Sequence, residues 1–274
     1  MPITCPIAIR DLTPAEFDAV DSVVMRHAYD CQNELGRLCD ERAYENDLAL
    51  RLHEAGCEVH TRVPLHVAHE NFAKTYRVDL VCNHGIYDAK AVLALTGEHD
   101  AQVLHYAMLL DVRHVKLLNF RPAKVQGRLQ FNDLTTAKRL CFETGASLWQ
   151  PLSDHCLPLR QRFAELLADW GAFLDYRLYE EALVHFFGGE MACVRRIDLT
   201  RDGSAIGTHR IQQHAPELCF LVSAVTKDLP AYQSHLQRLL KLTGLRGMQW
   251  MNLCHHQIQL ITLTGDGKRV GTSE

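Results

Sequence analysis

The hydrophobic and polar positions of this chain follow two periods, which alternate from the N-terminus to the C-terminus. Stretches with apolar residues three and four positions apart indicate helices, and shorter runs rich in Val, Ile, Leu, Tyr and Thr between turn residues indicate strands. In the first half the pattern predicts helices at 14–34, 39–55 and 98–111 and strands at 58–68, 74–82, 86–93, 114–120 and 125–132. In the second half it predicts helical structure at 158–186 and 229–243 and strands within 192–225 and 247–264. This order predicts an α/β fold with a mixed sheet in each half.

Residues 75–92, TYRVDLVCNHGIYDAKAV, contain two β-rich runs separated by a turn-forming Asn-His-Gly, which is the usual signal of a hairpin. Because side chains alternate along a strand, Asp88 and Lys90 share one face. Asp79 joins that face only if an even number of residues connects the two strands. We therefore expect an even-length loop or a compensating bulge.

Two carboxylates and a lysine on one edge of a sheet can hold Mg²⁺ and activate a water molecule for phosphodiester cleavage. An Asp-x-Lys triplet alone is weak evidence, because such triplets occur in almost any chain as solvated charges. On the helix upstream, Glu41 shares a face with Tyr44 and Glu45, and on the helix downstream Gln102 shares a face with Tyr106. Acidic and polar side chains thus accompany the hairpin on both sides in the sequence.

Taken in order, these segments resemble the GxxExxY family of the PD-(D/E)XK nuclease superfamily, in the branch near RecB-type and lambda-exonuclease-like nucleases. The resemblance runs from about residue 20 to residue 134. Its motif positions are Glu41 and Tyr44, the VPL strand at 63–65, Asp79, Asp88, Lys90, His99, Gln102, Tyr106 and the LNF strand at 118–120. The family's glycine is Leu38 here, and the usual Glu of its E-x-K triplet is Asp88, which the wider superfamily permits.

The resemblance implies a restriction-endonuclease-like mixed sheet flanked by helices, with a Mg²⁺ site that also accepts Mn²⁺. Asp79 and Asp88 are then the expected metal ligands, with the carbonyl of Ala89 as a third. Such a site suits Mg²⁺, which prefers hard oxygen ligands and keeps several waters. Glu41 is expected to hold a second metal or a metal-bound water.

Catalytic roles follow from the same resemblance. Lys90 is expected to orient or deprotonate the attacking water, and Gln102 and Tyr106 to position Lys90 or the substrate backbone. A lysine that acts as a base needs its pKa lowered by burial, whereas two neighbouring carboxylates raise it. The sequence therefore leaves the protonation state of Lys90 open.

The second half of the chain resembles the first. Aligned pairs of segments are 38–45 with 173–180, 75–80 with 208–213, 91–92 with 224–225 and 118–120 with 251–253. We interpret the chain as two tandem copies, a nuclease-like domain at 1–142 and a degenerate copy at 143–274, with a connector at 143–157 and a flexible tail at 265–274. The alternative is that amphipathic patterns of the same kind look alike without duplication.

The alignment confines the chemistry to the first copy. The second copy carries other residues at the site positions, namely Tyr176, Gln212, Leu221, Ser223, His235 and Leu239. It is expected to bind no metal and to act as a scaffold, a pseudo-dimer partner or a substrate-binding surface. We expect a monomer with an internal pseudo-dimer or a weak homodimer.

Composition adds limits on compartment and cofactors. The chain has 274 residues, is 47% hydrophobic and has neither a membrane-length apolar run nor a signal pattern, so we expect two domains, no membrane contact and a cytoplasmic location. Its ten cysteines form no CxxC pair. We therefore expect no iron–sulfur cluster and no zinc, including at residues 254–256.

Charge is the main objection to a nucleic-acid substrate, because the formal net charge is −4 and extended DNA binding normally leaves a basic footprint. Bound metal would offset the three acids of the site. Arg195, Arg196, Arg201 and Arg210 form either a backbone-contacting surface or an ordinary solvated strand edge.

Two functions of different classes remain. The first is a Mg²⁺-dependent nuclease that hydrolyses DNA, with single strands or ends favoured. The alternative is a catalytically silent module of the same fold that binds proteins or nucleic acid.

Overall fold

The computed structural model describes residues 3–265 of the chain. The chain divides into two compact units, Met1–Thr136 and Ala137–Glu274, so the division falls before the expected boundary at residue 142. Of the tail that we expect to be flexible, all but Gly265 lies outside the described residues. Within the described part, no helix combines the length and apolar character that a membrane crossing requires.

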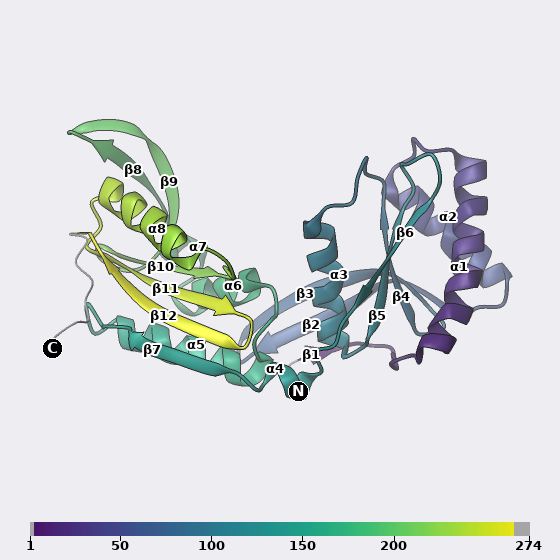
Figure 1. Cartoon of the computed structure of the whole chain (residues 1–274), viewed down its shortest axis with the longest axis horizontal. Helices are drawn as coiled ribbons and strands as arrows, with labels where there is room; N and C mark the ends of the chain where they lie inside the picture. The colour runs from purple at the N-terminus through teal and green to yellow at the C-terminus, as the bar shows by residue number, and fades with distance from the viewer. Residues whose placement is uncertain (1–2, 266–274) are drawn as a thin grey trace. The chain divides into compact units, whose positions relative to one another are not determined.

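The first unit is built on a six-stranded mixed sheet with the order β1-β2-β3-β4-β5-β6 (Figure 1). All neighbouring strands are antiparallel except β4 and β5, which are parallel. Parallel neighbours need a crossover connection, and α3 supplies it. The strands are β1 (Ile3–Thr4), β2 (Val59–His69), β3 (Phe72–Cys82), β4 (Gly85–Lys90), β5 (His114–Asn119) and β6 (Gln126–Phe131), and α3 spans Gly97–Leu110.

Two helices, α1 (Pro14–Leu35) and α2 (Glu41–Glu54), cover one face of this sheet, and α3 lies on the other (Figure 1). A buried cluster joins α1 and α2 to the sheet and includes Tyr87 and Ala89 of β4. Because side chains alternate along a strand, β4 must then direct Asp88 and Lys90 to the opposite face. The hydrophobic core thus decides which face carries the charged residues.

The second unit has a sheet of the order β7-β12-β11-β10-β9-β8. Its strands β10 and β11 are parallel, and β8–β9, β9–β10 and β11–β12 are antiparallel, which is the pairing pattern of β2 to β6. The strands are β7 (Glu143–Leu148), β8 (Val194–Arg201), β9 (Ser204–Ala215), β10 (Leu218–Ser223), β11 (Gly247–Cys254) and β12 (Gln257–Thr264). The helices are α4 (Thr136–Arg139), α5 (Cys156–Trp170), α6 (Tyr176–Phe186), α7 (Glu190–Cys193) and α8 (Leu229–Thr243).

The structure corrects two sequence-based expectations in the second unit. The first part of the expected connector forms β7, which pairs with β12 in parallel, and its exposed side chains give no hydrophobic alternation to detect. The expected helix at 158–186 is two helices, because Gly171 ends α5 with a left-handed φ of 80° that a helix interior does not allow. The short elements β1, α4 and α7 were not predicted either.

Two leucines of α2 test the packing of the first unit. Leu48 is 1% exposed and Leu50 is 63% exposed. Leu48→Ala is expected to lower the free energy of unfolding by about 2–5 kcal/mol, because it leaves a cavity in the core, whereas Leu50→Ala should change it by less than about 0.5 kcal/mol. Urea denaturation measures both, and equal effects would contradict this packing.

Candidate active site

The hairpin of β3 and β4 has a two-residue turn. Cys82 pairs with Gly85, and the pairing continues from there with Val81 opposite Ile86. Asn83 and His84 form the turn with φ of 43° and 69°, as a type I′ turn requires. The expectation of an even-length loop is therefore confirmed.

This register brings Asp79 onto the face of Asp88 and Lys90. The backbone N–H of Ala89 donates a hydrogen bond to Asp79 Oδ2 at 3.1 Å, so the carboxylate of β3 reaches across to β4. Asp79 is partly buried, whereas the side chain of Asp88 is fully buried. The sheet thus holds two carboxylates side by side in a poorly solvated place.

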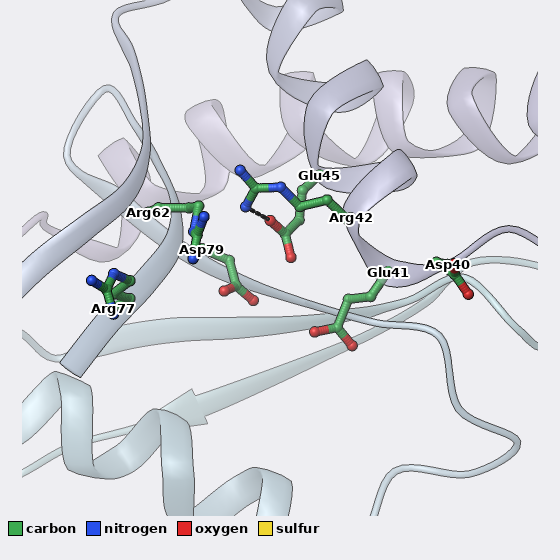
Figure 2. Close-up of a pocket in the computed structure, with 7 residues that line it drawn as sticks. All are labelled: Asp40, Glu41, Arg42, Glu45, Arg62, Arg77 and Asp79. Carbon is green, nitrogen blue, oxygen red and sulfur yellow. Dashed lines mark hydrogen bonds and ion pairs between the residues drawn. The ribbon is translucent and has the colours of Figure 1, made fainter.

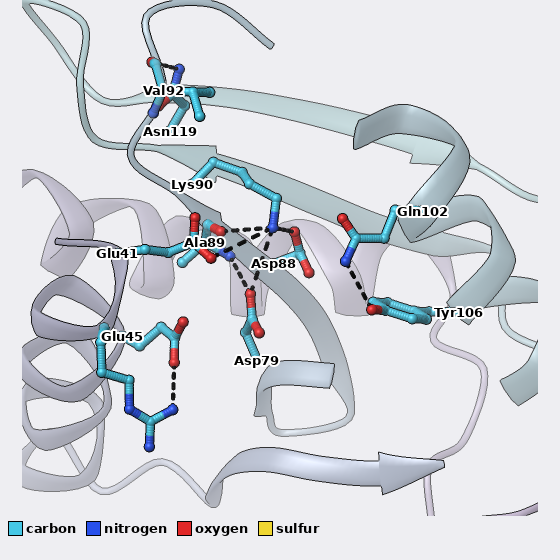
Figure 3. Close-up of polar contacts among 11 residues, drawn as sticks. Glu41, Glu45, Asp79, Asp88, Ala89, Lys90, Val92, Gln102, Tyr106 and Asn119 are labelled. Carbon is cyan, nitrogen blue, oxygen red and sulfur yellow. Dashed lines mark hydrogen bonds and ion pairs between the residues drawn. The ribbon is translucent and has the colours of Figure 1, made fainter. Parts of the chain in front are cut away.

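Lys90 connects the acidic residues of three elements (Figure 3). Its Nζ forms an ion pair with Asp88 Oδ2 and lies 3.8 Å from Glu41 Oε1 and 3.9 Å from Asp79 Oδ2. Nζ also donates to the carbonyl of Ala89 at 3.0 Å. Glu41 reaches this point because it is the first residue of α2, whose start lies beside the end of β4.

Gln102 and Tyr106 lie one turn apart on α3, and Gln102 Nε2 donates to the Tyr106 hydroxyl at 2.9 Å (Figure 3). Burial raises the pKa of Tyr106, and the charges of Asp88 and Asp79 raise it further. The pair therefore stands beside the carboxylates. His99, the first residue of the same motif, instead accepts the backbone N–H of Thr96 at 2.9 Å and caps α3.

The sequence analysis did not place Glu45 in the site, but the structure does. Carboxylate oxygens of Glu41, Glu45 and Asp79 lie within 4.8 Å of one another. Glu45 is 6% exposed and pairs with Arg42 Nη1 at 2.9 Å. The signal was available, because residues four apart on a helix share a face.

These acids line an open pocket of about 580 Å³ (Figure 2). Arginines share its wall with the acids, and two of them come from the β2–β3 hairpin. The lining residues are Asp40, Glu41, Arg42, Glu45, Arg62, Arg77 and Asp79. Arg62 and Arg77 were not identified from the sequence, because only the strand pairing brings them to the pocket.

The carboxylates are held where their charged forms are disfavoured. Burial, and then the charge of Asp88, raises the pKa of Asp79 from 3.8 to about 7. Burial also raises the pKa of Asp88, although Lys90 opposes the shift, and it raises the pKa of Glu41 and of Glu45. A divalent cation would relieve this desolvated charge.

The side chains present fit such a cation. Asp88 Oδ1 is buried and accepts no hydrogen bond within the described residues, so this oxygen is available as a metal ligand. Asp79 and Glu41 supply further carboxylate oxygens close by. The Ala89 carbonyl accepts from Lys90, which leaves its second lone pair for a metal. Hard oxygen donors of this kind suit Mg²⁺ or Mn²⁺.

Burial lowers the pKa of Lys90, but the carboxylates of Asp88, Glu41 and Asp79 outweigh it, and the net shift is upward. Of the two roles left open by the sequence, this charge balance favours an ammonium group over a general base.

Comparison with known families bears on the first unit. Residues 18–130 match the model of the PD-(D/E)XK nuclease superfamily. The match starts within α1 and ends in β6, and it includes every acidic residue of the site together with Lys90, Gln102 and Tyr106. Because members of this superfamily are usually nucleases that use Mg²⁺ or another divalent metal, the match suggests a metal-dependent, nuclease-like function. Comparisons with curated proteins and with solved structures gave no match.

The raised pKa of Asp79 predicts how stability depends on pH without metal. Since the folded state binds the proton more tightly than the unfolded state, Asp79 contributes stability below its usual pKa of 3.8, and this contribution is lost as pH rises toward about 7. Asp79→Asn should make the unfolding midpoint in EDTA less dependent on pH across that window. Asp18→Asn, at an exposed position of α1, controls for loss of a carboxylate and should keep the wild-type dependence. An unchanged slope in Asp79→Asn would contradict the burial argument.

Proposed function

We propose that this protein is a Mg²⁺-dependent deoxyribonuclease that hydrolyses phosphodiester bonds with a metal-activated water at one active site in the first unit. The observation that carries the proposal is the convergence of Asp79, Asp88, Glu41 and Lys90 from β3, β4 and α2 beside a solvent-open pocket. The superfamily match over the same segment supports it.

The proposed roles follow from the positions of the side chains. Asp79 and Glu41 would hold the metal, with Glu45 available because the carboxylate oxygens of these three residues lie within 4.8 Å of one another. Asp88, which pairs with Lys90, and the Ala89 carbonyl would be additional ligands. The bound ion would supply Lewis acidity and lower the pKa of a water.

Lys90, held as an ammonium by three carboxylates, would donate hydrogen bonds to the attacking water or to a phosphate oxygen and stabilise the negative charge that develops there. Gln102 orients the Tyr106 hydroxyl, which would position Lys90 or the substrate backbone.

We further propose that the two units arose by duplication of one domain. In the first unit, Asn119 lies opposite Lys90 in the β4–β5 register. Its side-chain amide accepts the backbone N–H of Val92 at 3.1 Å and donates to the carbonyl of Val92 at 2.8 Å. In the second, Asn252 makes the same pair of bonds to Val225, at 2.8 and 2.9 Å.

A second shared bond supports the same origin. Tyr44 on α2 donates its hydroxyl to the carbonyl of Gly36, at 2.8 Å, where the preceding helix ends. Tyr179 on α6 donates to the carbonyl of Gly171, which ends α5. Side-chain bonds to matching backbone positions are stronger evidence of common origin than amphipathic patterns alone.

The charges of Glu41, Asp79, Asp88 and Lys90 are not repeated in the second unit, whereas the counterpart of Glu45 is kept as Glu180. Gln212, the counterpart of Asp79, donates to Glu180 Oε1 at 2.7 Å, so an uncharged amide stands where the first unit has a carboxylate. Ser223, the counterpart of Lys90, donates to Asn252 and accepts from Trp250 Nε1. With Leu221 in place of Asp88, we infer that this unit binds no Mg²⁺ and serves as a scaffold or a substrate-binding surface.

One active site per chain can cut one strand at a time. We therefore propose nicking, single-strand or end-directed cleavage in preference to paired double-strand cuts.

Cleavage of labelled single- and double-stranded DNA with Mg²⁺ or Mn²⁺ tests the proposal. Lys90→Ala and Asp88→Asn are each expected to lower kcat at least about 100-fold, because each removes charge that acts in the transition state, and EDTA should abolish cleavage. His235→Ala, at the exposed counterpart of Gln102 in the second unit, should leave the rate unchanged. If no DNA or RNA is cut and calorimetry detects no Mg²⁺ or Mn²⁺ binding, the protein is a catalytically silent module.

A further inference from the structure

We propose that Arg62 and Arg77 form a phosphate subsite beside the metal-binding carboxylates, which binds the backbone phosphate next to the one that is cleaved. The inference rests on the proposed function and adds to it the part of the substrate that is recognised. It predicts that this site needs a polynucleotide and discriminates against an isolated phosphodiester.

Arg62 holds an unusual backbone conformation opposite a proposed metal ligand. In the β2–β3 ladder Thr61 pairs with Leu80 and Val63 with Val78, so the position between them faces Asp79, but no ladder pair forms there. Arg62 has a φ of 52°, in the left-handed region that favours glycine. A strained, bulky residue at this point indicates that its side chain is needed there.

Arg77 lies on the same strand as Asp79 and two positions before it, so both side chains leave β3 on one face. Figure 2 shows the side chains of Arg62 and Arg77 on one side of Asp79, and those of Glu41 and Asp40 on the other. The two arginines therefore flank the acidic cluster on the side of the β2–β3 hairpin.

Neither arginine forms a close ion pair with a neighbouring acid, although the charge of Arg62 acts on Glu45 and opposes the rise of its pKa. Both are exposed, and within the described residues neither makes a side-chain hydrogen bond or an ion pair. Arg42, the third arginine of the pocket, differs because it pairs with Glu45 at 2.9 Å. Two exposed guanidinium groups that line the pocket and donate no side-chain hydrogen bond within the described residues are available for an external anion.

The chemistry of the pocket selects phosphate as that anion. Once the carboxylates hold a divalent cation, the free guanidinium groups leave the wall positively charged. A guanidinium binds two phosphate oxygens through parallel N–H bonds, and it stays charged at any working pH. Lys90, at 7% exposed, lies among the buried carboxylates at the reacting end, so the exposed arginines address a different phosphate of the same strand.

Binding and its salt dependence test the subsite directly. A labelled single-stranded oligonucleotide is titrated with the full chain carrying Asp88→Asn, which prevents cleavage, alone and with Arg62→Ala and Arg77→Ala added. The double arginine change should weaken binding about 10-fold at moderate salt. It should also reduce the slope of log K against log salt by about the amount that one protein–phosphate contact contributes.

Arg113→Ala is the matched control. Arg113 is exposed and precedes β5 at the end of the sheet opposite Lys90, because β4 and β5 run parallel. Its loss removes one positive charge, half of what the double change removes, together with its ion pair to Asp11, and should leave the affinity and the salt slope unchanged.

Arg62→Gly separates recognition from folding. Glycine accepts the left-handed conformation, so this variant should melt at the same temperature as wild type or higher, yet bind the oligonucleotide more weakly. If Arg62→Gly and the double change, each added to Asp88→Asn, leave DNA binding as it is in the Asp88→Asn chain, the arginines only balance the acidic cluster and the subsite is refuted.

A kinetic comparison distinguishes this failure from failure of the nuclease proposal. In the chain with an intact Asp88, the arginine changes should raise KM for an oligonucleotide and leave cleavage of bis(p-nitrophenyl) phosphate, which lacks a neighbouring phosphate, unchanged. Equal effects on both substrates would refute the subsite alone. If the chain with an intact Asp88 cleaves neither substrate but the arginine changes still weaken its DNA binding, the nuclease is refuted and the subsite is retained.

Discussion

Strand β4 is buried on both faces, yet it carries two charged residues, and the first unit is arranged around that conflict. Every position of the strand is buried, including Asp88 and Lys90. Charge can stay in such a place only when it is paired and hydrogen-bonded. The ion pair between these two residues, the helix that delivers Glu41 and the hairpin that delivers Asp79 compensate it in part, and burial still raises the pKa values of Asp79 and Asp88.

The second unit shows what the same framework does without that conflict. Its asparagine and tyrosine make the same bonds to the backbone as in the first unit, while uncharged side chains occupy the positions of Asp79, Asp88 and Lys90. Gln212 and Glu180 satisfy each other directly. The first unit thus retains several carboxylates close together, whereas the second keeps Glu180 at the corresponding place and pairs it with an amide.

Much of the first unit could be predicted from the sequence, because its strands and helices have clear periods and its turn has the right residues. The predicted boundaries of α1, β3 and α3 lie within two residues of the observed ones at each end. The elements that escaped prediction lack such signals: β7 is a mostly exposed edge strand, and β1 is two residues long.

The residues of the candidate site likewise fall into those that could be predicted from the sequence and those that could not. Asp79, Asp88 and Lys90 share a face because of local alternation, which the sequence displays. Arg62 and Arg77 reach the pocket through strand pairing, which depends on the folded sheet.

The two-residue turn at Asn83 and His84 also sets a limit on how this chain can evolve. Surface loops usually tolerate insertions and deletions, since they carry few contacts. Here one residue more or less would rotate β4 by half a turn relative to β3, exchanging Tyr87 and Ala89 for Asp88 and Lys90 against the core. Core and catalytic face would be lost in a single step, so this short loop can change its residues but not its length.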